Sequence, residues 1–267
     1  MRLSLHDLRR LAGERKLATL TCYDASFAAL LDHAEVDMLL VGDSLGMVIQ
    51  GHDSTLPVTV ADVVYHTRAV ARGAGRAFLV ADMPFGSYQQ SPGQALDNAV
   101  QLMQSGAQMV KLEGGAEMAP TIAFLVARGV PVCGHVGLTP QHVNAFGGYR
   151  IQGRGDAGER VREAARAVEA AGAAMMVIEA VPEPLARSIA ADSRLLTIGI
   201  GASVHCSGQV LVLHDMLGVY PGKRPRFVRN FLDGAAATTI DAAARRYVAE
   251  VRAGRFPSAE HVYPEGA

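Results

Sequence analysis

Short apolar runs that each stop at a charged or polar residue recur along this chain and constrain its fold more than any other feature. The run 39–41 is followed by Asp43, and the run 77–81 is followed by Asp82. Uninterrupted apolar runs of this length are typical of parallel strands buried on both faces. Because parallel strands share one carboxyl edge, we expect the polar residues after them to meet at that edge.

Strand-like and helix-like segments alternate along the chain. The expected strands are 17–24, 39–41, 77–84, 108–115, 130–135, 174–182 and 195–202, with 226–228 as a weak eighth. The expected helices are 4–11, 25–33, 60–72, one opening at Ser91-Pro92, 158–171 and 235–252. This alternation favours an α/β fold, a (β/α)8 TIM barrel that spans residues 1–267 as a single domain. A doubly wound open sheet is the competing architecture, because the eighth strand is poor.

Charge and hydropathy exclude several classes of partner. Lys and Arg number 25 against 26 Asp and Glu, and no basic stripe is interleaved with aromatic residues, so we expect no nucleic-acid partner. No apolar run is long enough to cross a bilayer, and the amino terminus has no signal-like apolar region. The three cysteines, Cys22, Cys133 and Cys206, form no CxxC pair and are expected to be reduced and buried. We therefore expect a soluble cytoplasmic protein.

Chemically capable side chains gather at the predicted strand ends. They are Asp24, Asp43, Ser44, Asp82, Lys111, Glu113, His135 and Glu179. Carboxylates that converge on one barrel mouth repel each other and need a cation or a shared proton. Oxygen ligands without a thiolate or a paired-His motif suit Mg²⁺, which uses one or two carboxylates and leaves its other positions to water and substrate.

Each of these residues also has a purely structural interpretation. A strand-end Asp often caps the next helix, and a single histidine such as His135 is often a satisfied core residue. Ser44 has no GxSxG context, so we do not expect a nucleophilic serine. The Gly-rich segment 147–155 lacks a Walker ending, and we interpret it as a loop that closes over the barrel mouth.

Seven segments together resemble one enzyme family, ketopantoate hydroxymethyltransferase (3-methyl-2-oxobutanoate hydroxymethyltransferase), in order and over almost the whole chain. They are 41–46 (VGDSLG), 82–88 (DMPFGSY), 110–115 (VKLEGG), 134–141 (GHVGLTPQ), 147–154 (GGYRIQGR), 178–182 (IEAVP) and 208–212 (GQVLV). The resemblance implies a barrel of the phosphoenolpyruvate/pyruvate-like type, assembled as a homodecamer of two pentameric rings. It also implies transfer of a hydroxymethyl group from 5,10-methylenetetrahydrofolate to 3-methyl-2-oxobutanoate, with one Mg²⁺ per subunit, in pantothenate synthesis.

The resemblance also implies roles for individual residues. By position, they are Asp43 and Asp82 as metal ligands that also contact substrate, Glu113 as the third metal-site acid, Ser44 and Lys111 at the substrate carboxylate, His135 in the substrate pocket, and Glu179 as the catalytic base. The chemistry agrees with this assignment. A 2-oxo acid offers two oxygens to Mg²⁺, and its weakly acidic C3–H needs a nearby carboxylate base.

The chain departs from the family pattern after the seventh predicted strand. Ser203 stands where the family commonly has Gly, and Ser207 where it has Asp. Because serine does not adopt positive φ as freely as glycine, the loop geometry and folate binding are the properties we expect to change.

Two rival functions remain at this stage. A Mg²⁺-dependent carbon–carbon lyase or phosphonomutase of the isocitrate lyase/phosphoenolpyruvate mutase type would share the fold, but the Lys-Lys-Cys-Gly-His-like loop typical of that type is missing around Cys133. A barrel retained only as a scaffold predicts loss of the metal-site acids, and all of them are present.

Overall fold

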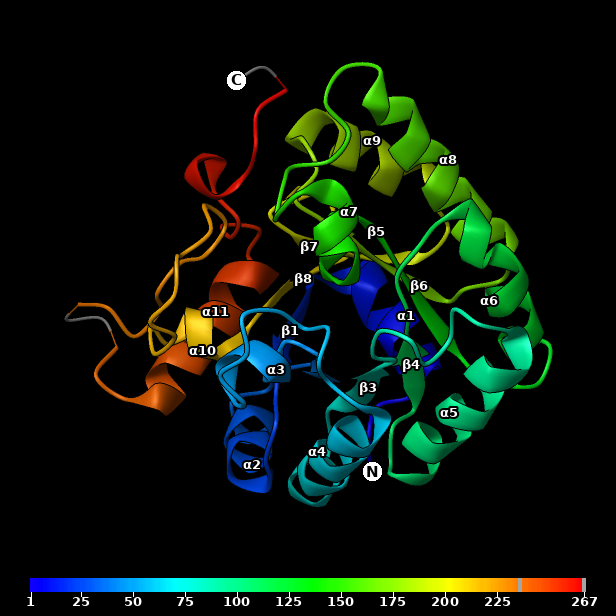
Figure 1. The fold of residues 1–267 in the computed structure, drawn as a ribbon. Helices are drawn as coiled ribbons and strands as arrows, with labels where there is room; N and C mark the ends of the chain where they lie inside the picture. Colours follow the sequence, from blue (N-terminus) through cyan, green and yellow to red (C-terminus); the bar gives the residue numbers. More distant parts are fainter. Residues whose placement is uncertain (235–236, 266–267) are drawn as a thin grey trace.

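Eight parallel strands close into a barrel in sequence order, as Figure 1 shows. The structure is a computed structural model that describes residues 1–234 and 237–265. The strands are β1 (Leu17–Thr21), β2 (Met38–Val41), β3 (Phe78–Asp82), β4 (Met109–Lys111), β5 (Val132–Gly137), β6 (Met175–Glu179), β7 (Leu196–Ile200) and β8 (Gly208–Leu211). Almost every strand residue is buried, as the apolar runs predicted, and the barrel rather than the open sheet is confirmed.

Helices surround the barrel and connect its strands (Figure 1). They are α1 (Leu5–Glu14), α2 (Ala25–His33), α3 (Leu45–Val48), α4 (Val60–Gly73), α5 (Pro92–Gln104), α6 (Ala119–Val126), α7 (Val143–Phe146), α8 (Ala157–Ala170), α9 (Glu183–Asp192), α10 (Leu213–Met216) and α11 (Ile240–Arg252). Among the residues described, no helix is both long and apolar enough to cross a membrane.

Side-chain caps fix where several helices begin. Ser4 and Thr59 each form a capping box, with Asp7 in α1 and Asp62 in α4. Ser91 caps α5, and Pro92 occupies its first turn, where a missing N–H costs no hydrogen bond. These caps were readable in the sequence because they depend on residues only three positions apart.

The expected eighth strand was wrong. Residues 226–228 lie in an irregular segment, and the barrel closes through β8, which pairs with both β1 and β7. Strand β8 has only four residues and begins with a glycine, so its apolar pattern was weak. The expected closing helix also begins later, at Ile240; the predicted start at Ala235 lies outside the described residues.

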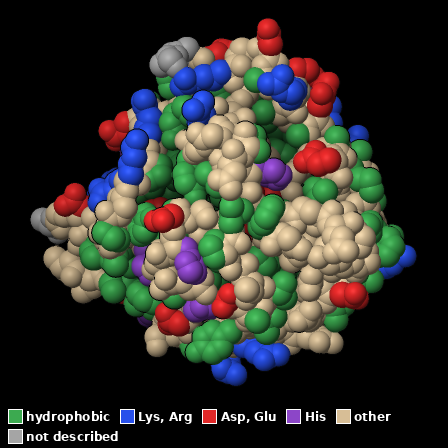
Figure 2. All heavy atoms as spheres, viewed as in Figure 1, with side chains coloured by type: hydrophobic (Ala, Val, Ile, Leu, Met, Phe, Trp, Pro, Cys, Tyr) green, Lys and Arg blue, Asp and Glu red, His purple; other side chains and the backbone are tan. Residues whose placement is uncertain are grey.

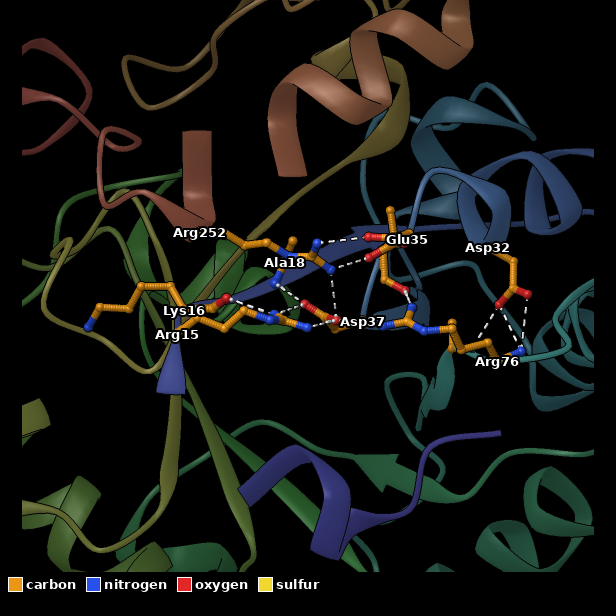
Figure 3. Close-up of polar contacts among 10 residues, drawn as sticks. Arg15, Lys16, Ala18, Asp32, Glu35, Asp37, Arg76 and Arg252 are labelled. Carbon is orange, nitrogen blue, oxygen red and sulfur yellow. Dashed lines mark hydrogen bonds and ion pairs between the residues drawn. The ribbon is translucent and has the colours of Figure 1, made fainter. Parts of the chain in front are cut away.

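A buried carboxylate joins several elements at the end of the barrel where the strands begin (Figure 3). The Asp37 side chain is fully buried and accepts two 2.7 Å hydrogen bonds from Arg15, one at each carboxylate oxygen. Arg76 and Arg252 contact the same carboxylate at 3.1 and 3.3 Å. The main-chain N–H of Ala18, in β1, donates to it at 3.0 Å. Asp37 therefore joins the starts of β1, β2 and β3 to α11.

Candidate active site

The carboxyl ends of the strands surround one cavity of about 640 Å³. Seven of the eight side chains predicted at the strand ends line it: Asp43, Ser44, Asp82, Lys111, Glu113, His135 and Glu179. The eighth, Asp24, has the structural role that was its alternative interpretation, because its side chain caps α2 by accepting from Phe27 N–H. Figure 2 shows hydrophobic side chains around a hollow on this face.

Strand register brings the first ion pair together. Asp82 ends β3 directly beside Lys111, which ends β4. Lys111 Nζ lies 2.8 Å from Asp82 Oδ1, and both side chains are buried. Burial acts to lower the pKa of Lys111, but the charges of Asp82, Glu113 and Asp43 outweigh it and raise the pKa. The ammonium therefore stays charged at physiological pH.

Asp43 lies against Asp82 across the β2–β3 edge. The Asp43 main-chain N–H donates to Asp82 Oδ2 at 3.0 Å. Gly42 leaves room for the neighbouring serine, since a Cβ there would lie 2.8 Å from Ser44 Oγ but at an ordinary 3.5 Å from Asp82 Oδ2. The other small residue of this stretch, Gly46, instead packs against Val58.

Gln141 connects two of the acids, and sequence reasoning did not single it out. Its Nε2 donates to Asp43 Oδ2 at 2.8 Å, and its main-chain N–H donates to Glu113 Oε2 at 2.9 Å. Its own Oε1 accepts from Tyr88 Oη at 2.6 Å. Gln141 lies in a connection after β5 rather than at a strand end, so the strand-end pattern could not identify it.

His135 lies between two carboxylates. Its Nδ1 is 3.3 Å from Glu113 Oε1, and its Nε2 is 3.2 Å from Glu179 Oε2. These are ion-pair contacts without hydrogen-bond alignment, so Glu113 Oε1 and both ring nitrogens have no hydrogen-bond partner among the described residues. Burial and Lys111 act to lower the pKa of His135, but Glu113 and Glu179 raise it to about 9. At neutral pH the ring is therefore an imidazolium that compensates both acids.

Glu179 ends β6, and hydrogen bonds hold the main chain of the residue that follows it. The next residue, Ala180, adopts φ 46°, a left-handed conformation that is uncommon for a residue with a side chain. Ala180 N–H donates to Ile200 O at 2.9 Å, and Gln152 N–H donates to Ala180 O at 3.0 Å. Backbone strain held from both sides is typical of functional sites.

The acids at the strand ends form the floor of the cavity, and they carry more negative charge than Lys111 and His135 neutralise. Asp43, Asp82, Glu113 and Glu179 face one ammonium and one imidazolium, which leaves two negative charges uncompensated. Burial, followed by the charges of Asp82 and Glu113, accordingly raises the pKa of Asp43 well above its usual range. A divalent cation would supply the missing charge, and Glu113 Oε1, which accepts no hydrogen bond from a described residue, would be available to it or to its water.

The acids do not form a complete metal cage by themselves. Within residues 1–234 and 237–265, no group of three or more His, Cys, Asp or Glu side chains is positioned to hold a metal ion. Mg²⁺ does not require such a group, because it retains waters and binds through one or two carboxylates and substrate oxygens. The donor set around Asp43 and Asp82 fits an ion of that kind.

The cysteines and the two unusual serines lie outside this chemistry. Cys22, Cys133 and Cys206 are buried and unbridged, and burial raises the pKa of each thiol, to about 12, 12 and 11. Ser203 is buried, has no positive φ, and donates to Glu183 Oε1 at 2.9 Å. Ser207 contacts Thr197 near the start of β7, away from the cavity. The strain expected at Ser203 is therefore not present.

The segment 147–155 borders the cavity through one residue. Tyr149 lines the mouth, with its hydroxyl 3.5 Å from Met47 Sδ. On the floor nearby, Ser44 Oγ lies 2.9 Å from Tyr23 Oη. Tyr23 is buried behind Ser44, so it orients the serine hydroxyl that faces the cavity.

A second wall of the cavity comes from the chain after β8 and had no place in the strand-end prediction. This wall is formed by Val212, Asp215, Tyr220, Lys223, Arg224, Arg226 and Phe227. Figure 2 shows Lys and Arg side chains on the left side of the hollow, over the segment after α10. The cavity therefore has an acidic floor at the strand ends and a separate wall that is partly apolar and basic towards solvent.

Two solved structures of barrel enzymes share the architecture of this chain. The solved structure of 2,3-dimethylmalate lyase, a PEP mutase/isocitrate lyase superfamily member, matches with a TM-score of 0.57 at 16% identity, over 82% of this chain and 80% of that one. Phosphonopyruvate hydrolase in complex with oxalate and Mg²⁺ matches with a TM-score of 0.60 at 14% identity, over 79% of this chain and 81% of that one. At such identities the likeness establishes the fold alone, a TIM barrel.

Sequence comparison identifies the family of this chain. The profile of the ketopantoate hydroxymethyltransferase family matches residues 2–259. The 3-methyl-2-oxobutanoate hydroxymethyltransferase of Dechloromonas aromatica (strain RCB) is 60% identical over 98% of this chain and 96% of its own length. That of Azoarcus sp. (strain BH72) is 61% identical over 97% and 96%. The chain belongs to the ketopantoate hydroxymethyltransferase family and is an enzyme of the transferase class.

Proposed function

We propose that this chain catalyses the reaction for which its family is named. A hydroxymethyl group passes from 5,10-methylenetetrahydrofolate to 3-methyl-2-oxobutanoate and gives 2-dehydropantoate, a precursor of pantothenate and coenzyme A. The names of the relatives support this acceptor. The observation that carries the chemistry is the contact of Glu179 with His135, in the same cavity as the Asp82–Lys111 pair.

The residues of the floor divide the work on the 2-oxo acid. Lys111 and Ser44 bind the substrate carboxylate, because Lys111 is a buried ammonium and Ser44 presents a hydroxyl oriented by Tyr23. Glu179 removes the proton from C3, and the imidazolium of His135, 3.2 Å away, holds that carboxylate in position.

Asp43 and Asp82 are the residues that would hold one Mg²⁺, with Glu113 acting directly or through water. When bound, the metal would polarise the 2-oxo group and stabilise the negative charge that develops as the proton leaves. The oxalate and Mg²⁺ named for phosphonopyruvate hydrolase support this proposal by analogy of fold.

The bond changes balance with one water. The C3–H bond breaks and its proton goes to Glu179, and C3 forms a bond to the methylene carbon of the folate. The two bonds from that carbon to folate N5 and N10 break, and water supplies the hydroxyl oxygen. One proton from the water and the proton held by Glu179 go to the two nitrogens, and tetrahydrofolate leaves. The lyase alternative, which would need a reactive cysteine, is not favoured at Cys133, because burial raises the pKa of this thiol to about 12.

The decisive experiment follows hydrogen exchange at C3 of 3-methyl-2-oxobutanoate in D₂O by NMR, with Mg²⁺ and with EDTA. We expect exchange that depends on Mg²⁺, and its absence in every condition would refute the enolate mechanism. Glu179→Gln should abolish exchange while Mg²⁺ binding, measured by calorimetry, remains. Glu183→Gln, four residues later at the start of α9, is the matched control.

Assembly and location follow the family in this proposal: a homodecamer of two pentameric rings in the cytoplasm. Sedimentation analysis of the purified chain tests the assembly, and a mass other than ten subunits would contradict it.

A further inference from the structure

Among the described residues that line the cavity, Asp215 is the one acid that the proposed chemistry does not use. It lies in α10, beyond β8, on the wall that is partly apolar and basic towards solvent. No hydrogen bond or ion pair joins its carboxylate to any residue in the described part of the chain. A half-buried carboxylate that faces a cavity without a partner is costly for the fold, so its presence calls for a ligand.

The surroundings of Asp215 specify what kind of ligand fits. Val212, Tyr220 and Phe227 line the same wall, and Phe227 is only 8% exposed. These side chains offer apolar and aromatic surface to a flat ring. A carboxylate has two acceptor oxygens side by side, so it pairs best with two adjacent N–H donors on such a ring.

Exposure to solvent increases along this wall. Asp215 is half-buried, whereas Lys223 and Arg224 further along the same wall are exposed. Burial raises the pKa of Asp215 to about 6, and the charge of Arg224 acts in the opposite direction. A ligand that matches this order carries N–H donors on an inner ring and negative charge on an outer tail.

Tetrahydrofolate has this distribution of groups. Its pterin ring presents a 2-amino group and the neighbouring N3–H on one edge, and its tail ends in glutamate carboxylates. Resting on the proposed function for the identity of the co-substrate, we propose that Asp215 recognises the pterin by accepting hydrogen bonds from the 2-amino group and N3–H. Asp215 is then a specificity residue of the folate half of the cavity, separate from the floor that binds the oxo acid.

The experiment measures direct binding of tetrahydrofolate by calorimetry, so that it does not depend on turnover. Asp215→Asn and Asp215→Ala should weaken binding about 10- to 100-fold, the range expected for losing a charge-assisted hydrogen-bonded pair. The matched control is Asp97→Asn on the outside of α5, which should bind like the parent. Thermal melting of each variant verifies folding, and a variant that fails to fold is replaced by Asp215→Ser.

A ligand change tests the same contact from the other side. In an analogue with a methyl group in place of the 2-amino group, the parent should lose about tenfold or more in affinity, whereas Asp215→Ala should bind both compounds alike. Equal tetrahydrofolate binding by parent and Asp215→Ala, or an analogue penalty that persists in Asp215→Ala, would overturn the proposal. Hydrogen exchange by the parent tests the proposed function separately, so a failure of one is distinguishable from a failure of the other.

Discussion

Gln141 Nε2 lies 2.8 Å from Asp43 Oδ2, although 98 residues separate the two in sequence. The main chain of the same glutamine holds Glu113 at 2.9 Å, so one residue sets the spacing of two proposed metal-site acids. Partners of this kind orient the carboxylates that contact a metal.

Replacing Gln141 by Leu removes the donor and keeps the side-chain size. We expect Mg²⁺ affinity and the rate of Mg²⁺-dependent C3–H exchange to fall about 10- to 100-fold. Calorimetry and NMR exchange measure the two quantities. Gln101→Leu, on the exposed side of α5, is the control, and unchanged Mg²⁺ affinity in Gln141→Leu would contradict the role.

Removal of Mg²⁺ should lower the stability of the folded chain, because the crowded acids then repel without compensation. A ligand present at 100 times its dissociation constant stabilises the folded state by about 2.7 kcal/mol. We expect melting in Mg²⁺ to exceed melting in EDTA, and Asp43→Asn to abolish this difference. The same variant should melt higher than the parent in EDTA, since the raised pKa of Asp43 marks an unfavourable charge. A Mg²⁺ response equal to that of the parent would refute Asp43 as a ligand.

Asp215→Asn should stabilise the folded protein at pH 8 while weakening tetrahydrofolate binding. The folded pKa of about 6 exceeds the unfolded value of about 3.9, so the folded parent loses stability as pH rises between those two values. The gain from Asp215→Asn is therefore full above about pH 6 and absent below about pH 4, with a size of about 1–2 kcal/mol. Urea unfolding at pH 4 and pH 8 measures it, and an equal effect at both pH values would exclude titration of Asp215 as the cause.

Salt should weaken tetrahydrofolate binding through the exposed end of the Asp215 wall. Lys223 and Arg224 reach solvent beside the cavity mouth, where an attraction to glutamate carboxylates is screened by ions. We expect the double variant Lys223→Ala, Arg224→Ala to bind tetrahydrofolate less tightly at 0.05 M salt and to lose most of the salt dependence. The charge-matched control is the double variant Arg9→Ala, Arg10→Ala in α1, which removes two positive charges from residues that do not line the cavity.

Asp37→Asn should lower the free energy of unfolding by about 2–4 kcal/mol, because three arginines lose a buried carboxylate. Because the three arginines are partly exposed, the expected loss in free energy of unfolding lies towards the lower end of the range for breaking a buried ion pair. Arg15 and its neighbours depress the pKa of Asp37 despite its burial. Its contribution is therefore present above the unfolded pKa and is lost as pH falls through the depressed value in the folded state. Urea unfolding measures the free energy of unfolding of Asp37→Asn. The control is Asp7→Asn, which loses only a hydrogen bond of the exposed α1 cap.

The sequence alone determined the barrel and most of its proposed chemistry, because both depend on local order. Apolar runs define buried parallel strands, and the residue that follows each run must lie at the shared carboxyl edge, as Asp82, Lys111 and Glu179 do. Local pattern could not distinguish a helix cap from a cavity residue at Asp24, and a four-residue strand such as β8 has too little pattern to recognise.

Only the tertiary structure decided which residues support that chemistry. The contacts of Gln141 with Asp43 and of His135 with both flanking acids join separate strands and loops, so no spacing in the sequence encodes them. Asp215 looks like any other acid in the chain until the fold leaves its carboxylate on a cavity wall without a partner. Pairing and burial of charge are properties of the closed barrel, and they decide where function can lie.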